Sequence, residues 1–256
     1  MKLIQSRDNP FFKSLKRLAE SGRERRKTGQ TLLDGVHLVE AYEAVFGPVE
    51  TLIVAESALA SGEISVFVEG RDTVVLADSL LRDLGLVDTP SGLLAVARMP
   101  TAIATVNREK NAILLDSVQD PGNVGTLLRT AAAAGIGQAL LSTGCASAWS
   151  PKVLRAGQGA HFALAIHEDV DLAGFMADYQ GTTAVTTLEE ATSLYDARWD
   201  GPLAWVFGAE GQGVSPELLA AAQLRIRIPM PGAVESLNVA AAAAICLFEM
   251  MRRRLA

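Results

Sequence analysis

The sequence has little cysteine and no long apolar run, and each shortage excludes a class of protein. Only two of its 256 residues are cysteines, Cys145 and Cys246, and their spacing fits neither a disulfide framework nor a CxxC metal site. The longest apolar run, Val239 to Phe248, is mostly alanine and is shorter than the roughly 20 residues that span a bilayer. The first ten residues are polar and charged rather than signal-like. We therefore expect a cytoplasmic protein with reduced thiols and no membrane partner.

Histidine is also scarce. The three histidines, His37, His161 and His167, show no mutual spacing suited to a metal cluster or a catalytic triad. We expect them to be structural or surface residues, and we expect no metal.

The net charge of −6 argues, taken alone, against a nucleic acid partner. Its distribution is uneven, however, because residues 1–30 hold nine Lys or Arg and three acidic residues, and the rest of the chain carries −12. An acidic protein with one basic end can steer a polyanion to that end. Phe11 and Phe12 lie among the cations and could stack on RNA bases, although a solvated amphipathic helix is the simpler alternative. The candidate RNA contacts are Arg7, Asn9, Lys13, Arg23, Arg25, Arg26 and Lys27.

The hydropathy pattern predicts two α/β domains, residues 1–105 and 106–256, joined through the polar stretch 101–111. In the first domain, helical patterns at residues 10–20 and 37–45 alternate with strand-like runs at 31–35, 51–55, 66–69 and 93–99. In the second domain, short apolar runs alternate strictly with helical patterns, which indicates a mainly parallel sheet covered by helices. The last helix is long and rich in alanine.

Three segments of the second domain place polar or glycine residues directly after an apolar run, where they can reach a ligand at the end of a buried strand. These segments are DSVQDPGNVGTLLRT (residues 116–130), VFGAEGQGVSPE (206–217) and IPMPGAVESLNVAAAA (228–243). The glycine-rich loop of the second segment could signify a dinucleotide site and hence a nicotinamide-dependent oxidoreductase. Its glycine order is G-x-x-G-x-G, however, and Glu210 would repel phosphates, so a cationic or neutral ligand fits better.

In the third segment, Pro229 and Pro231 stiffen the turn before the last helix, so the peptide groups of Ile228 and Met230 become fixed hydrogen-bonding edges. Adenine could be bound there by backbone atoms. The alternative for Ser236 and Asn238 is simple capping of the last helix.

In order, wording and spacing, the three segments resemble the motifs of the SpoU family of RNA ribose 2′-O-methyltransferases, in particular its TrmH/RlmB-like ribosomal RNA enzymes. This family belongs to the SPOUT class, which uses S-adenosylmethionine. The resemblance implies a C-terminal, trefoil-knotted methyltransferase domain with a mainly parallel sheet, a homodimer formed through that domain, and a small N-terminal ribosomal-protein-like domain that binds RNA. It favours ribosomal RNA over transfer RNA as substrate.

The resemblance also implies roles for individual residues. Asn123 and Arg129 match the family's catalytic asparagine and arginine, and Glu210, Ser236 and Asn238 organise this arginine and the nucleotide. The implied donor-binding residues are Gly208, Gly211, Ile228, Met230 and Leu237, with Thr187 and Leu188 beside them. The family commonly has a serine where this chain has Gly157.

Arg129 matches a residue to which the family assigns the role of general base. A guanidinium keeps its proton above pH 12, so we expect Arg129 chiefly to clamp the phosphate beside the target ribose. An exposed structural charge on a helix is the alternative for Arg129. An RNA-binding protein without catalytic activity is the alternative for the whole chain, although the intact motif residues argue against it.

Overall fold

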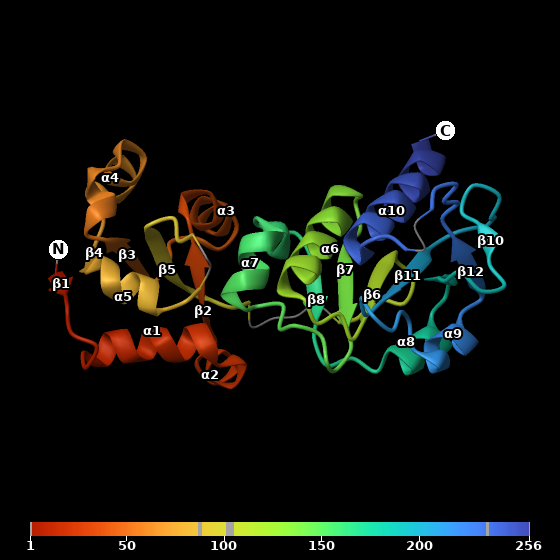
Figure 1. Ribbon diagram of the computed structural model, residues 1–256, viewed down its shortest axis with the longest axis horizontal. Coiled ribbons are helices and arrows are strands. Elements are labelled where there is room, and N and C mark those ends of the chain that lie inside the picture. The colour runs from red at the N-terminus through yellow and green to blue at the C-terminus, as the bar shows by residue number, and fades with distance from the viewer. Residues whose placement is uncertain (1, 87–88, 101–104, 234–235, 256) are drawn as a thin grey trace. The chain divides into compact units, whose positions relative to one another are not determined.

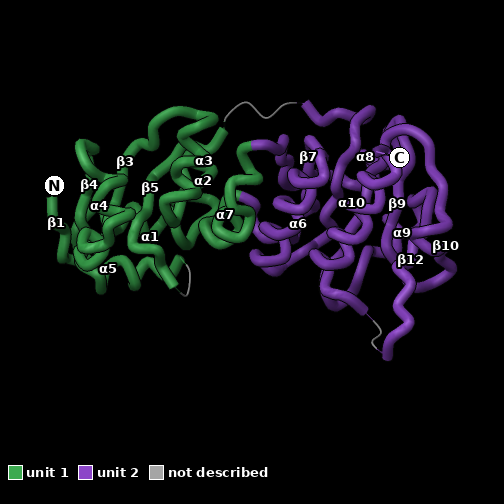
Figure 2. The backbone as a smooth tube through the Cα atoms, turned by 90° about the horizontal axis from the view of Figure 1, so that it is seen from above, with its two compact units in different colours: residues 1–102, 149–162 green, residues 103–148, 163–256 purple. Residues whose placement is uncertain are grey.

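The computed structural model describes residues 2–86, 89–100, 105–233 and 236–255, and the chain divides into two compact units (Figure 1 and Figure 2). The first unit contains Met1–Ala102 and Trp149–Phe162, and the second contains Ile103–Ala148 and Ala163–Ala256. Residues 149–162, which the sequence pattern places in the second domain, thus pack with the first unit. The functional division at residue 105 stays a prediction.

The first unit is built on a mixed sheet. In spatial order its strands are β1 (Lys2–Ile4), β4 (Thr73–Leu76), β3 (Thr51–Ala55), β5 (Leu93–Arg98) and β2 (Gln30–Asp34). Strand β5 pairs antiparallel with both β3 and β2, and the other pairings are parallel. The helices of this unit are α1 (Pro10–Glu20), α2 (Gly22–Thr28), α3 (Val36–Phe46), η1 (Ser57–Ala60), α4 (Gly62–Val68), α5 (Asp78–Asp83), α7 (Pro151–Gly157) and η2 (Ala160–Phe162).

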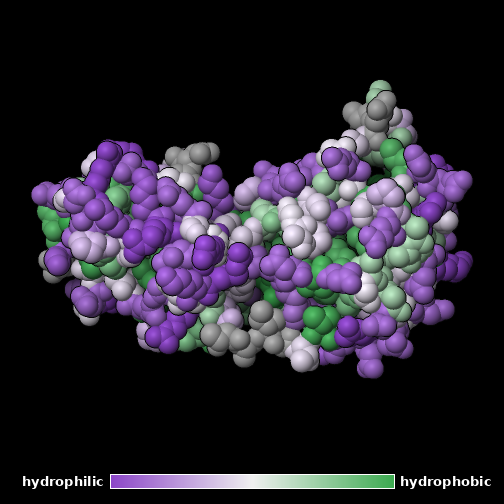
Figure 3. All heavy atoms as spheres, turned by 90° about the horizontal axis from the view of Figure 1, so that it is seen from below, coloured by the Kyte–Doolittle hydropathy of each residue, from purple (hydrophilic) through white to green (hydrophobic). Residues whose placement is uncertain are grey.

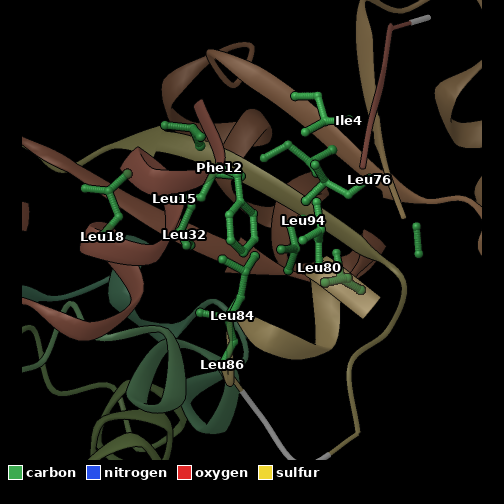
Figure 4. Close-up of a cluster of buried hydrophobic side chains, with 14 residues drawn as sticks. Ile4, Phe12, Leu15, Leu18, Leu32, Leu76, Leu80, Leu84, Leu86 and Leu94 are labelled. Carbon is green, nitrogen blue, oxygen red and sulfur yellow. The ribbon is translucent and has the colours of Figure 1, made fainter. Parts of the chain in front are cut away.

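Helix α1 begins at a cap that its sequence predicts. The side-chain oxygen of Asn9 accepts the backbone N–H groups of Phe11 and Phe12, and Pro10 occupies the first turn. Phe12, Leu15 and Leu18 recur at three-residue spacing and are buried against the sheet (Figure 4). The prediction that Phe12 stacks on RNA is therefore wrong, because its ring is 2% exposed and belongs to the core.

The strand expected at residues 66–69 is also wrong. These residues lie at the end of α4, which buries Ile64 and Val68, four positions apart on one helix face. The strand of this region is β4, which follows α4. A short apolar run does not distinguish a buried helix turn from a strand, and here the packing of the i and i+4 side chains decides the outcome.

Residues 149–162 are attached to the first unit by burial and by hydrogen bonds. Leu154 is fully buried in the same apolar cluster as Leu33 and Val39. The Thr31 hydroxyl donates to the Trp149 carbonyl oxygen at 2.7 Å, and Arg155 donates to the Asp34 carbonyl oxygen at 2.9 Å. Gly157, which stands where the family commonly has serine, is buried at the end of α7.

The second unit has a sheet in which every described pairing is parallel, as the sequence pattern indicated. In spatial order its strands are β10 (Thr192–Ser193), β12 (Leu224–Arg227), β9 (Thr182–Thr186), β11 (Leu203–Gly208), β6 (Ala112–Asp116), β7 (Gln138–Leu141) and β8 (Ala165–His167). Its helices are α6 (Pro121–Ala133), α8 (Leu172–Asp178), α9 (Pro216–Ala221) and α10 (Val239–Leu255). The central strands β6 and β11 are buried along their whole length, which is typical of a parallel sheet covered on both faces.

Helices α6 and α10 pack against each other in the second unit, and α10 also contacts β11. Because α6 follows β6 directly, its N-terminus lies at the carboxyl edge of the sheet, where parallel sheets bind ligands. In the part of the chain that the structure describes, no helix combines the length and the apolar character needed to cross a membrane.

Candidate active site

The loop after β11 turns back tightly over the end of its own strand. The backbone N–H of Gly213 donates to the Ala209 carbonyl oxygen at 2.8 Å, and Gly213 has a φ of +71°. A Cβ atom on Gly208 would lie 2.1 Å from the carbonyl carbon and oxygen of Gly213 and 2.2 Å from the backbone nitrogen of Val214. Glycine is favoured at position 208, because any larger residue would force the opposing backbone atoms to shift.

Three polar side chains from distant parts of the sequence form a chain of hydrogen bonds at the carboxyl edge of the parallel sheet. The side-chain amide of Asn123, on α6, donates to Oε1 of Glu210 at 2.7 Å. The side-chain amide of Asn238, just before α10, donates to Oδ1 of Asn123 at 2.9 Å. The structure thus brings together three of the five residues that the resemblance names as catalytic.

The direction of this hydrogen-bond chain is fixed at both ends. A carboxylate can only accept, so the NH₂ group of Asn123 must face Glu210 and its oxygen must face Asn238. At the other end, Oδ1 of Asn238 accepts the backbone N–H groups of Ala240 and Ala241, in the first turn of α10. Asn238 therefore caps α10 and also takes part in the hydrogen-bond chain, and the cap holds its amide toward Asn123.

Two further carboxylates at the same edge of the sheet accept backbone hydrogen bonds. Neither is among the residues to which the family resemblance gives a role. Asp120 caps α6, because its Oδ1 accepts the backbone N–H of Asn123 at 2.8 Å. Asp116, the last residue of β6, is 8% exposed, and its Oδ2 accepts the backbone N–H of Ser215 at 2.8 Å. The sequence signal for Asp116 was an acidic residue that ends an otherwise apolar strand, AILLD.

Arg129 and Ser236 lie near these residues in sequence but outside the hydrogen-bond chain. Arg129 is exposed on α6 and, within the described residues, its guanidinium forms no hydrogen bond or ion pair. Ser236 is exposed as well and has no hydrogen bond in the same part of the chain. A guanidinium without a protein partner is available to a phosphate group of a ligand.

The residues implied to bind the donor follow the carboxyl ends of three adjacent strands. Gly208 ends β11, Thr187 and Leu188 follow β9, and Ile228 and Met230 follow β12. The backbone N–H of Thr187 donates to the Ile226 carbonyl oxygen, which ties the ends of β9 and β12 together. Gly211 is exposed at the tip of the loop after β11.

Two large apolar side chains of this set face solvent. Leu188 is 60% exposed and Leu237 is 38% exposed, although most large apolar residues of the unit are buried. Exposed apolar side chains suit a ligand that has an apolar ring system.

The thiols of the second unit are unsuited to nucleophilic catalysis. Burial raises the pKa of Cys145, and it raises the pKa of Cys246 to about 12. Both cysteines therefore stay protonated at neutral pH, and a thiol in that state is a poor nucleophile.

A hollow of about 640 Å³ lies at the opposite end of α10, lined in part by Arg198, Trp199 and Arg253. We do not assign the donor to it, because none of the three motif segments lines it. Arg253 is occupied there by an ion pair with Glu249 and by the Trp199 ring, 4.5 Å from its guanidinium.

In the first unit, three of the candidate RNA-binding cations are exposed and form no ion pair within the described residues: Arg23, Arg26 and Lys27, all on α2. Arg7 and Lys13 are exposed but paired, with Asp83 at 2.9 Å and with Asp8 at 2.8 Å. Figure 3 views the molecule from the side of α1 and α2 and shows hydrophilic side chains over much of this part of the first unit. The side-chain oxygen of Asn9 is used as the cap of α1.

Arg25 requires a correction. It is 5% exposed, and its guanidinium donates to the carbonyl oxygens of Leu18 and Ala19 at the end of α1. Burial leaves this side chain almost no surface for RNA, so its role is to hold α1 against α2. A run of basic residues on a short helix gave no sign of which cation would face inward.

Comparison with known proteins finds a matching family model for each of the two parts of the chain. The model of the SpoU rRNA Methylase family matches residues 110–248, and that of the MRM3-like substrate binding domain matches residues 9–95. The 23S rRNA (guanosine(2553)-2′-O)-methyltransferase RlmP of Bacillus subtilis is 32% identical over 253 residues, which cover 98% of this chain and 99% of that protein.

Solved structures agree over the full length. A crystal structure of an RNA 2′-O ribose methyltransferase has a TM-score of 0.85 and 30% sequence identity, and covers 99% of this chain and 100% of its own. The AdoMet-bound rRNA methyltransferase from Sinorhizobium meliloti has a TM-score of 0.80 and 25% identity, and covers 100% of this chain and 98% of its own. With its motif residues gathered at one edge of a parallel sheet, the chain belongs to the SpoU rRNA methylase family.

Proposed function

We propose that this protein transfers a methyl group from S-adenosylmethionine to a ribose 2′-hydroxyl of ribosomal RNA. The observation that carries this proposal is the hydrogen-bond chain from Asn238 through Asn123 to Glu210, which joins the three motif segments at one edge of the sheet. Supporting it are the rRNA specificity of RlmP and the AdoMet bound in the Sinorhizobium meliloti structure.

The residues at the edge fit the donor by their chemistry. S-adenosylmethionine carries a sulfonium and an ammonium but no phosphate, so the Glu210 carboxylate attracts it, whereas it would repel a dinucleotide. Gly208, Gly211, Ile228 and Met230 offer backbone groups, and Leu237 offers exposed apolar surface. When bound, the donor supplies a methyl carbon that its sulfonium has already activated.

The protein then has to align the ribose oxygen and to neutralise the RNA. Asn123 retains one N–H and one lone pair beyond its two hydrogen bonds, so it can orient the sugar from a fixed direction. A guanidinium can form two parallel hydrogen bonds to a phosphate group, so we assign the exposed Arg129 to a bidentate contact with the phosphate beside the target ribose.

The α2 cations Arg23, Arg26 and Lys27 contact RNA phosphates on the first unit, supported by the match to a substrate binding domain. The second unit forms a homodimer and threads its C-terminal part into a trefoil knot, as the family resemblance implies. Two free thiols support a reducing, cytoplasmic location.

The test is methyl transfer by the full chain. The protein is incubated with labelled S-adenosylmethionine in two separate reactions. One contains purified ribosomal RNA, and the other contains purified transfer RNA. We expect label in the ribosomal RNA and little in transfer RNA. Equal label in both would refute the rRNA preference, and no affinity for the donor or for S-adenosylhomocysteine by calorimetry would refute the proposed activity.

A further inference from the structure

We propose that Asp116 is a positioning residue that anchors the loop Ala209–Ser215 and thereby shapes the site for the methyl donor. This inference rests on the proposed function and extends it to a residue to which the family resemblance gives no role. Its basis is a charge-assisted hydrogen bond between the end of β6 and the far end of the loop.

The position of Asp116 follows from the register of the sheet. It pairs with Gly208 at the last register position of β6 and β11, so its side chain leaves the sheet where the loop begins. Oδ2 accepts the backbone N–H of Ser215 at 2.8 Å, and the residue is 8% exposed. A buried carboxylate costs free energy unless it is paired or hydrogen-bonded, and this contact compensates part of that cost.

The Asp116 contact closes a loop that is held at two other points. Glu210 meets Asn123 near its start, and the backbone of Gly213 and Val214 lies directly over Gly208. Ser215 is the cap residue of α9, but its side chain accepts no capping hydrogen bond. Asp116 therefore supplies a hydrogen bond that ties the end of the loop to the neighbouring strand, next to the buried side chain of Val214.

The backbone beside Asp116 is unusual as well. Ser117 has a φ of +55°, a left-handed conformation that residues other than glycine rarely adopt. The Ser117 backbone N–H donates to the Ser142 hydroxyl at 2.9 Å, which fixes this turn to the end of β7. Strain of this kind persists where the surroundings determine the geometry, and here it directs the chain from Asp116 toward α6 and Asn123.

The experiment compares Asp116→Ala, Asp116→Asn and Ser215→Pro in the full chain. Alanine removes the acceptor, asparagine keeps an oxygen that can accept, and proline, whose ring suits the φ of −59°, removes the donor N–H together with the serine hydroxyl. We expect the Kd for S-adenosylmethionine to rise about tenfold in the alanine and proline variants, and the asparagine variant to recover most of the affinity. The KM for RNA should not change.

Hydrogen exchange provides a readout that needs no donor. Backbone amides of residues 209–215 should exchange about tenfold faster in Asp116→Ala and in Ser215→Pro than in the unaltered protein. The matched control is Asp34→Ala in the first unit, where a buried carboxylate also accepts a backbone N–H, that of Ser91. This control should lose thermal stability without a change in donor affinity or in the exchange of residues 209–215.

Two results would overturn the inference. One is unchanged exchange of residues 209–215 in Asp116→Ala; the other is a donor Kd that rises equally in Asp34→Ala, which would reflect lower stability alone. If the unaltered protein binds no donor, the proposed function fails, while the exchange measurement still decides whether Asp116 anchors the loop.

Discussion

The side-chain amide of Asn238 donates to the side-chain oxygen of Asn123 at 2.9 Å, although 115 residues separate them. Because Asn238 also caps α10, the start of the last helix and the start of α6 are fixed to each other. Glu210 continues the hydrogen-bond chain into the loop after β11. The orientation of one amide, that of Asn123, thus depends on three separate segments of the sequence.

Asn238→Asp separates the two roles of this residue. Aspartate still caps α10, so the thermal midpoint should stay within about 2 °C of the unaltered protein. It cannot donate to Asn123, so we expect kcat for methyl transfer to fall about a hundredfold while the donor Kd stays the same. Calorimetry and initial rates measure the two quantities. A large loss of donor binding would contradict this division of roles.

Arg129→Lys tests the phosphate contact. Lysine keeps the positive charge but loses the planar fork, so kcat/KM for RNA should fall more than about tenfold with an unchanged donor Kd. The pH profile of the remaining activity should keep its shape, because Arg129 is not assigned to proton removal. Near-normal activity of the lysine variant would argue against a bidentate contact.

Gly208→Ala tests the close approach of the loop to its own strand. The added Cβ has no space, because the backbone of Gly213 would lie 2.1 Å away. We expect a loss of about 1–3 kcal/mol in the free energy of unfolding, together with weaker donor binding. Gly137→Ala is the matched control, since nothing lies within 4 Å of a Cβ at that position. Equal stability of the two variants would show that the loop can move aside.

Simultaneous replacement of Arg23, Arg26 and Lys27 by alanine tests the RNA surface of α2. RNA affinity should fall, and the slope of log K against log salt should decrease by about one for each phosphate that the protein no longer neutralises. The comparison is Arg108→Ala, an exposed cation of the second unit that faces Asp178. Salt titrations of RNA binding that are identical for the two proteins would remove α2 from the interface.

Glu249→Gln tests the acid stability of α10. Hydrogen bonds from Arg252 and Arg253 lower the pKa of Glu249 from 4.5 to about 2 in the folded protein. A lowered folded-state pKa stabilises the fold above pH 4.5, and this contribution is lost as the pH falls toward 2. Since Arg252 is 65% exposed, we expect the variant to lose only about 1 kcal/mol at pH 7. Urea unfolding at pH 7 and pH 3 should show this difference shrinking; a constant difference would contradict the ion-pair assignment.

Much of the second unit could be predicted from the sequence, because strict alternation of strands and helices leaves few alternatives to a parallel sheet. Strand β10 could not, since Thr192–Ser193 is too short to show any period. The packing of Leu154 with Leu33 could not be predicted either. The apolar character of a side chain predicts that it is buried, but it does not predict which residues it packs against.

The candidate site likewise has features that the sequence predicts and features that only the structure shows. Motif spacing selects Asn123, Glu210 and Asn238, and the structure adds the two hydrogen bonds that connect them. Local composition cannot separate the buried Arg25 from its exposed neighbour Arg26, because tertiary contacts with the end of α1 decide that difference. The sequence marks Asp116 only as an acidic residue that ends an apolar strand, because its hydrogen-bond partner, Ser215, lies 99 residues away.

The most direct test of the proposed function is the chemical position of the transferred methyl group. Ribosomal RNA methylated with labelled S-adenosylmethionine is hydrolysed with alkali, which cannot cleave a linkage next to a 2′-O-methyl ribose. We expect the label to stay in alkali-resistant dinucleotides for the unaltered protein and to disappear with Asn123→Ala. Label recovered in mononucleotides, and therefore on a base, would contradict ribose methylation.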